Sequence, residues 1–212
     1  IDIVFEKDGF ITITDNGRGL PTNMNKDTGK HGIEMCMATL HAGSSFTNTD
    51  VNQATSSVNG VGASCVNAMS EEFNVSVFKK GKRYYLSYQN GYPGYFTDKG
   101  FIEGNKIKSE PCEHEQGTSI RFKFNDKFFA DTERVIIDDI INRSEYTVYL
   151  IPNLTITIHD HTRSKEDGGG DYEFTGEGLA ELVEKVSHAD SLTKEKVYSF
   201  QSTGKYKSKN VD

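Results

Sequence analysis

The sequence predicts an α+β fold, a two-layer sandwich in which helices cover one face of a mixed β-sheet. Two observations predict it. Short segments of alternating polarity recur along the chain, and segments with helical spacing of apolar residues lie between them. The length of 212 residues suits one large domain, or one domain and part of a second.

The first predicted element is a β-hairpin. Ile1, Ile3 and Phe5 alternate with polar residues, and the alternation resumes at Ile11 and Ile13 after an Asp-Gly pair. The second strand ends at residues 15–21, where two glycines and a proline break the pattern.

Two helices are expected next, on either side of a long polar segment. Ile33, Met37 and Leu40 share one face of a helix over residues 32–41. Residues 42–57 are rich in Ser, Thr, Asn and Gly, a composition and length typical of a lid or of a disordered segment. Residues 59–62 then open a second helix that continues to Met69.

The remaining chain predicts a meander of strands with further helices. Strands are expected at residues 73–77 and 84–88 around a turn at Gly81, at one or two places within 95–107, and at 117–124 and 154–158. Helices are expected over residues 132–149 and around residues 179–183, with a glycine turn at 168–170 between them. Residues 197–200 predict the first strand of a further unit.

Composition excludes several classes of function. The chain carries 24 Lys and Arg against 31 Asp and Glu, a net charge of −7, so we expect no appreciable binding of duplex DNA by this chain alone at physiological salt. No apolar run approaches the ~18 residues of a membrane helix, and the first residues do not resemble a signal peptide, so we expect no membrane contact.

Cysteine and histidine spacing predicts neither a disulfide framework nor a metal site. Cys36, Cys65 and Cys112 form no CxxC pair, and we interpret them as buried free thiols in a reducing cytoplasm. His159 and His161 form the one HxH pair, which we interpret as an exposed turn because no third ligand follows.

Three short motifs could each bind a ligand. The alternatives are a simple turn for the first, a tightly packed helix cap for the second and a strand-opening Thr for the third. Asp15 ends a strand and is followed by Gly17 and Gly19, which let a ligand approach the backbone closely. The glycines within residues 59–64 sit at a helix start, where backbone N–H groups and the helix dipole favour an anion. Gln116, Gly117 and Thr118 open a strand.

Together, and in this order, the three motifs resemble the GHKL nucleotide-binding family, which has the Bergerat fold. Within it, the local match is closest to the ATPase domain of the B subunits of bacterial-type type IIA topoisomerases, gyrase and topoisomerase IV. The likeness is carried by residues 15–21, 40–43 with Phe46, 59–70 and 117–122, and a weaker likeness extends to about Phe200.

The resemblance implies a nucleotide-binding role for the first motif. In such enzymes the acid aligned with Asp15 accepts a hydrogen bond from the adenine amino group. Gly17, Arg18, Gly19 and Pro21 would line the adenine pocket.

The other two motifs would complete the site. Asn59, Gly60, Val61 and Gly62 would cradle the phosphates, and Thr118 would support the adenine through a bridging water. Residues 42–57 would close over the nucleotide as a lid.

The chain also departs from the family pattern. Family members carry a helix with a general-base Glu and a magnesium-binding Asn before the first strand, whereas this sequence begins at that strand. We therefore assign no catalytic and no metal-binding residue here and expect no ATPase activity from this chain alone. The lysine of the following transducer domain that reaches the γ-phosphate is also expected to lie outside the chain.

Several family residues are replaced within the chain. Ser45 and Gln53 stand where the family has lysines of the lid. Ser56 and Ser57 replace a pair of glycines, Asn59 replaces a histidine, and Tyr85 replaces an arginine. The cations nearest to the phosphates in sequence are Arg18 and Lys30, neither of which has a family role.

The resemblance implies the ATP-binding part of a type IIA topoisomerase B subunit. Residues 1–190 would be the GHKL domain without its first helix, and residues 191–212 a linker and the start of an incomplete transducer domain. The complete enzyme would use ATP with Mg2+, dimerise through its ATPase gate to drive DNA strand passage, and contact DNA and an A-type subunit only as a holoenzyme.

Two other interpretations remain open. The chain could be a degenerate nucleotide-binding or protein-interaction module with the same fold, which the replaced lysines favour. It could also be another GHKL enzyme, such as a mismatch-repair ATPase or a sensor kinase, although residues 59–64 fit those less well.

Overall fold

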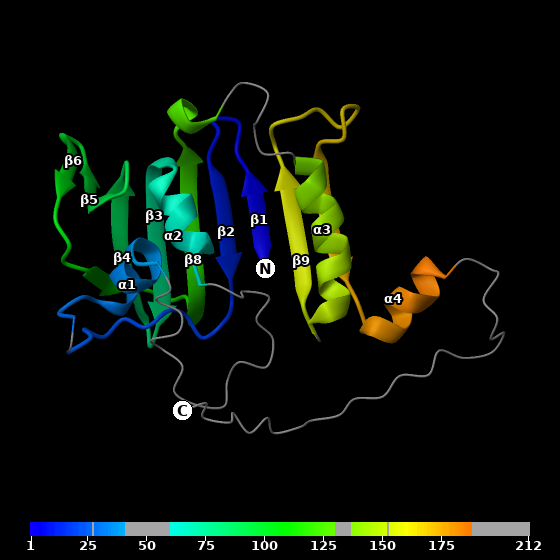
Figure 1. The fold of residues 1–212 in the computed structure, drawn as a ribbon, viewed down its shortest axis with the longest axis horizontal. Coiled ribbons are helices and arrows are strands. Elements are labelled where there is room, and N and C mark those ends of the chain that lie inside the picture. Colours follow the sequence, from blue (N-terminus) through cyan, green and yellow to red (C-terminus); the bar gives the residue numbers. More distant parts are fainter. Residues whose placement is uncertain (27, 41–59, 130–136, 152, 188–212) are drawn as a thin grey trace, which may run out of the picture.

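A computed structural model describes residues 1–26, 28–40, 60–129, 137–151 and 153–187 (Figure 1). Ten strands form one sheet in the order β10-β9-β1-β2-β8-β3-β4-β5-β6, with β7 paired to β4. The sheet is mixed, because β1 runs parallel to β9 while the other pairs are antiparallel. This confirms the predicted α+β class.

The element bounds are as follows. The strands are β1 (Asp2–Phe5), β2 (Ile11–Asp15), β3 (Ser70–Lys79), β4 (Lys82–Gln89), β5 (Tyr92–Thr97), β6 (Gly100–Glu103), β7 (Lys108–Pro111), β8 (Gln116–Phe124), β9 (Thr155–Asp160) and β10 (Gly170–Thr175). The helices are α1 (Gly32–Ala38), α2 (Gly62–Ala68), α3 (Ile137–Leu150) and α4 (Leu179–Val186), with a short 3-10 helix η2 (Asp126–Phe128).

One face of the sheet is apolar across six adjacent strands. Side chains that face one another across β9, β1, β2, β8, β3 and β4 form a continuous row: Ile158, Ile3, Ile13, Ile120, Val75 and Leu86. Helices α1, α2 and α3 lie on this face (Figure 1), and their apolar residues join the same core. Burial of this face is the main stabilising contribution to the fold, at about 25 cal/mol per Å² of apolar surface.

The other face is polar, as is common for sheets that meet water on one side. Thr14 and Ser119 share a hydrogen bond across β2 and β8, with 3.0 Å between their hydroxyl oxygens. Arg121 donates to both carboxylate oxygens of Glu6 at 2.9 and 2.8 Å. This bond is the main cause that lowers the pKa of Glu6 below its usual value.

The direction of α2 follows from two fixed points. Its C-terminal residue is followed directly by β3, and the Asn125 backbone N–H donates to the carbonyl of Met69 at 2.9 Å, at the end of β8. The last turn of α2 thus lies near the end of β8, and its first turn lies closer to the beginning of that strand (Figure 1). Asn67 Nδ2 donates to the carbonyl of Met37 at 2.9 Å, which joins α2 to α1.

Helix α1 is shorter than the sequence predicts. The expected helix reached residue 41, but the structure ends it at Ala38 because Thr39 takes extended dihedral angles. Ile33 and Met37 are buried as expected, whereas Leu40, placed on the same face by the sequence pattern, is exposed. A β-branched residue loses side-chain freedom in a helix, which favours the early end.

Two strands were not predicted. β7 is exposed along its whole length, so its sequence lacks the alternation that burial on one face produces. β10 follows the predicted glycine turn, but its alternation of Tyr172 and Phe174 with polar residues was overlooked. The strands expected within residues 95–107 are β5 and β6, and α3 and α4 correspond to the last two predicted helices.

The cysteine and histidine interpretations need correction. All three thiols are free, but Cys65 is exposed and Cys36 and Cys112 are only partly buried. Helix α2 buries Ser64 and Asn67 instead, because those two positions face the sheet and α1. His159 lies within β9 rather than in a turn. Among the described residues, no helix has the length and apolar character needed to cross a membrane.

Candidate functional site

Asp15, the last residue of β2, lies on the face of the sheet that carries the helices. It is directly opposite Thr118 in β8, and Thr118 is in turn opposite Val77 in β3. Because opposite residues in adjacent strands share a face, the carboxylate of Asp15 and the hydroxyl of Thr118 are neighbours. Thr118 is buried and Asp15 is half-buried, so the two predicted site residues lie side by side where β2 ends.

The turn after Asp15 is shaped by that same carboxylate. The Gly17 backbone N–H donates to Asp15 Oδ1 at 2.8 Å, which holds the side chain in one orientation. None of the described residues donates to Oδ2. A carboxylate with one oxygen fixed, and with no donor among the described residues to the other, can accept a further hydrogen bond at that second oxygen.

Gly19 brings the turn back onto the sheet. A side-chain carbon at this position would lie 2.9 Å from Val77 Cγ1 and 3.1 Å from the carbonyl oxygen of Gly117. Residues 16–19 therefore pack directly against the beginning of β8 and the end of β3. Gln116 adds a further contact, since its Nε2 donates to the carbonyl of Asn16 at 3.3 Å.

Position 117 requires glycine for two reasons, its backbone conformation and its closeness to Asp15. Its φ of +142° lies in a region that residues with a side chain rarely adopt, and a Cβ there would overlap the carbonyl of Asp15. The close approach lets β8 place Thr118 beside Asp15.

Pro21 connects this turn to α1. A Cβ on Gly32, the first residue of α1, would overlap the backbone and ring of Pro21. Sequence reasoning did not single out Gly32, which packs directly against the predicted site residue Pro21. A glycine at the first position of a helix, where most residues are favoured over it, was the available signal.

The second motif lies at the start of α2. Gly60, Val61 and Gly62 lie before and within its first turn, and this end of α2 points toward the strand end that holds Asp15 and Thr118 (Figure 1). The N–H groups of the first turn of a helix, which begins here at Gly62, have no acceptor within the helix. Asn59 and the expected lid, with Ser45, Gln53, Ser56 and Ser57, lie outside the described residues.

Cations and metal ligands near the site are few in the described part of the chain. Arg18 is exposed on the turn, and Lys30 lies 3.9 Å from the carboxylate of Glu34. Within the same residues, no group of three His, Cys, Asp or Glu side chains could hold a metal ion.

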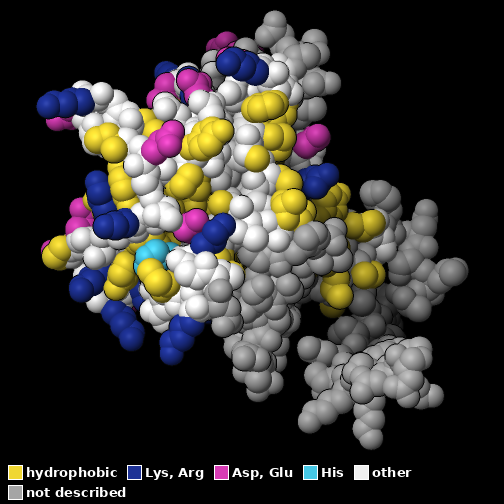
Figure 2. Space-filling view, turned by 60° about the vertical axis from the view of Figure 1, so that its left-hand side comes forward, with side chains coloured by type: hydrophobic (Ala, Val, Ile, Leu, Met, Phe, Trp, Pro, Cys, Tyr) yellow, Lys and Arg dark blue, Asp and Glu magenta, His cyan; other side chains and the backbone are white. Residues whose placement is uncertain are grey.

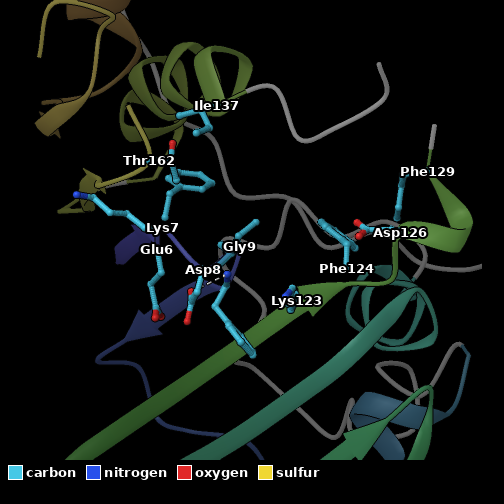
Figure 3. Close-up of a pocket in the computed structure, with 13 residues that line it drawn as sticks. Glu6, Lys7, Asp8, Gly9, Lys123, Phe124, Asp126, Phe129, Ile137 and Thr162 are labelled. Carbon is cyan, nitrogen blue, oxygen red and sulfur yellow. Dashed lines mark hydrogen bonds between the residues drawn. The ribbon is translucent and has the colours of Figure 1, made fainter. Parts of the chain in front are cut away.

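A cavity of about 460 Å³ lies elsewhere, at the other end of β2. It is bounded by the β1–β2 turn, the end of β8 and the start of α3, as Figure 3 shows for Asp8, Lys123 and Ile137. Charges of both signs and aromatic rings surround it, and one of its carboxylates, Glu6, is already held by Arg121. None of the predicted site residues lines it, so it does not enter the candidate site.

Comparison with known proteins identifies relatives of this chain. The chain is 34% identical over 192 residues to the B subunit of DNA topoisomerase 4 from Staphylococcus aureus strain MW2, and the same holds for strain N315. That match covers 91% of this chain and 27% of the relative. No family model matches the chain.

A solved structure supports the same relationship. The 43K ATPase domain of Thermus thermophilus gyrase B, crystallised with an aminocoumarin, matches with a TM-score of 0.71 and 25% identity. The match covers 96% of this chain and 48% of that one. The chain thus spans about a quarter of the length of the curated relatives and about half of the solved domain.

Proposed function

We propose that this chain, a homologue of the ATPase domain of type IIA topoisomerase B subunits, is the ATP-binding portion of such a protein. The observation that carries the proposal is the pairing of Asp15 with Thr118 beneath the turn of residues 16–19. In this pairing a carboxylate oxygen that accepts from none of the described residues lies beside a buried hydroxyl at a strand end, where a flat base would bind.

Asp15 would select adenine by its hydrogen-bonding character. A carboxylate offers only acceptors, and adenine presents an amino donor where guanine presents a carbonyl. Gly17, Arg18, Gly19 and Pro21 would form the wall beside the base. Thr118 would support it from the floor of the site, directly or through water.

The start of α2 would hold the phosphates. Gly60, Val61 and Gly62 would present backbone N–H groups to them, and nothing among the described residues occupies the space beside Gly62. We include Asn59 in this role from the family pattern alone. We assign no residue of this chain to Mg2+, which in the complete enzyme would neutralise charge on the phosphates.

At the level of the whole protein, nucleotide binding would drive dimerisation of the ATPase gate and so DNA strand passage with an A-type subunit. Residues 1–190 would form the nucleotide-binding domain, and residues 191–212 would lead into a transducer domain. The single sheet that unites the described residues up to Thr175 supports the first of these assignments.

Nucleotide-dependent thermal stabilisation tests the proposal. Ligand at ~100 times its Kd stabilises a fold by ~2.7 kcal/mol, which for a chain of this size raises Tm by roughly 5–10 °C. We expect that rise with ADP at millimolar concentration and a smaller one with GDP. Equal shifts, or none with either nucleotide, would favour the degenerate module instead.

A further inference from the structure

The turn between β3 and β4 concentrates positive charge in an acidic protein. Residues 79–83 read Lys-Lys-Gly-Lys-Arg, whereas the whole chain has a net charge of −7. Figure 2, which brings the β4 side of the sheet forward, shows Lys and Arg side chains gathered along the lower part of this face. We call Lys79, Lys80 and Lys82 the basic turn.

Two of these lysines are placed where their charges repel. Lys79 and Lys82 are directly opposite each other at the end of the β3–β4 pair. Like charges at opposite positions destabilise a hairpin. No described carboxylate forms an ion pair with Lys79, Lys80 or Lys82, whereas the adjacent Arg83 is held by Glu110 at 3.1 Å and by Ser76 at 3.0 Å.

The third lysine occupies an unfavourable backbone conformation. Lys80 and Gly81 have φ values of +55° and +71°, which define a two-residue type I′ turn. That turn favours Asn-Gly, and the chain uses Asn-Gly at the equivalent turn between β4 and β5, where Asn90 and Gly91 have φ values of +50° and +82°. The β3–β4 turn thus carries lysine where the same sheet elsewhere uses the residue that fits better.

Three positions in one turn therefore depart from what the fold favours, each by a lysine. Such local conflicts are expected where a surface has a binding role. We propose that the basic turn is a contact site for the sugar-phosphate backbone of duplex DNA. Lysine suits this ligand because duplex DNA carries one charge per ~1.7 Å of axis and phosphate contact needs no base sequence.

The choice of DNA among polyanions rests on the proposed function. The basic turn would add to other DNA contacts of the complete protein rather than hold DNA by itself. Three phosphate contacts give a slope of about −2.7 for log K against log salt, so affinity falls about 40-fold between 50 and 200 mM salt. The free chain should therefore bind a mixed-sequence duplex at 50 mM salt and almost not at all at 200 mM.

The test compares two triple variants by fluorescence anisotropy with a labelled 20-base-pair duplex. Changing Lys79→Gln, Lys80→Asn and Lys82→Gln should weaken binding at 50 mM salt by roughly tenfold or more and bring the slope close to zero. The control changes Lys99→Gln, Lys127→Gln and Lys165→Gln, which removes equal charge from three separate exposed positions and should leave affinity and slope nearly unchanged.

Stability separates a binding role from a structural one. Lys80→Asn alone restores the favoured turn residue, so it should raise Tm by roughly 2–4 °C while weakening DNA binding. The ADP-dependent thermal shift should persist in every variant, which distinguishes failure here from failure of the proposed function. Equal losses in both triple variants, equal binding of poly-glutamate, or the absence of any salt-dependent binding by the parent chain would each overturn the proposal.

Discussion

Asp15 and Thr118 face each other across the antiparallel pair of β2 and β8, although 102 residues separate them along the chain. The turn after Asp15 packs against the residue before Thr118, so the two strands and the turn position one another. A change in β2, in β8 or in the turn at this end of the sheet is therefore expected to weaken ligand binding more than it disturbs the core.

The first prediction concerns Asp15. Asp15→Ala removes the only acceptor that we assign to the adenine amino group, and an unpaired buried donor costs about 1–3 kcal/mol, or roughly 5- to 150-fold in Kd for ADP. Asp15→Asn keeps one acceptor oxygen and should lose less. Isothermal titration with ADP measures both, and Asp98→Asn, an exposed carboxylate in the β5–β6 turn, is the control. Unchanged affinity in Asp15→Ala would remove this residue from the site.

The second prediction uses two glycines that both have a positive φ but differ in surroundings. Gly117 and Gly100 have φ values of +142° and +108°, yet a Cβ on Gly117 would overlap Asp15 while one on Gly100 would meet open space. Gly100→Ala should cost only the backbone strain, about 1–3 kcal/mol. Gly117→Ala should lower Tm further and also weaken ADP binding. Equal effects of the two changes on both readouts would contradict the packing described here.

The third prediction is a pH dependence at His159. Its Nδ1 lies 2.7 Å from Asp171 and its Nε2 3.1 Å from Asp2, and the bond to Asp171 is the main cause that raises the His159 pKa above its usual value. The neighbouring His161 ring is 6.4 Å away. Because the pKa is higher in the folded state, His159 stabilises the fold fully below its unfolded pKa of about 6.5 and loses that contribution as pH rises through the folded value.

Urea unfolding of the parent chain and His159→Gln at pH 5.5 and pH 8 measures this effect. The difference in the free energy of unfolding between the two proteins should be larger at pH 5.5. His161→Gln serves as the comparison and should show a smaller change between the two pH values. A difference that grows toward pH 8 would mean that His159 is held in its neutral form.

The fourth prediction concerns a buried carboxylate. The side chain of Asp160 is 0% exposed and accepts bonds from Arg163 Nε at 2.6 Å and from the backbone N–H and hydroxyl of Thr162 at 2.9 and 2.6 Å. Burial alone would raise the Asp160 pKa, but the bonds from Thr162 and Arg163 lower it below its usual value.

Arg163→Ala should therefore be strongly destabilising, by about 3 kcal/mol, because it leaves that carboxylate without its cation. Glu110→Ala breaks the exposed pair with Arg83 and should change stability by about 0–1 kcal/mol. Chemical denaturation of the two variants gives the comparison. Similar losses in both would show that burial of Asp160 adds nothing to the pair.

The sequence by itself determined the elements in which apolar residues recur at a regular spacing. Alternation of apolar with polar residues located the β1–β2 hairpin, β3, β4 and β8, and the order of the three glycine-containing motifs indicated the nucleotide-binding family. It missed β7, which is exposed on both faces and so has no apolar period. It also extended α1 past Ala38, since helix ends depend on a few dihedral angles that apolar spacing does not encode.

Only the tertiary structure decided how the motifs meet. Asp15, Gly19, Val77 and Thr118 belong to three segments, and their contacts depend on the register of β2, β8 and β3. A shift of one residue in either strand pair would move Asp15 or Thr118 to the polar face and separate them. Register is fixed by the long-range packing of the apolar face against α1, α2 and α3, and for that reason no local pattern in the sequence contains it.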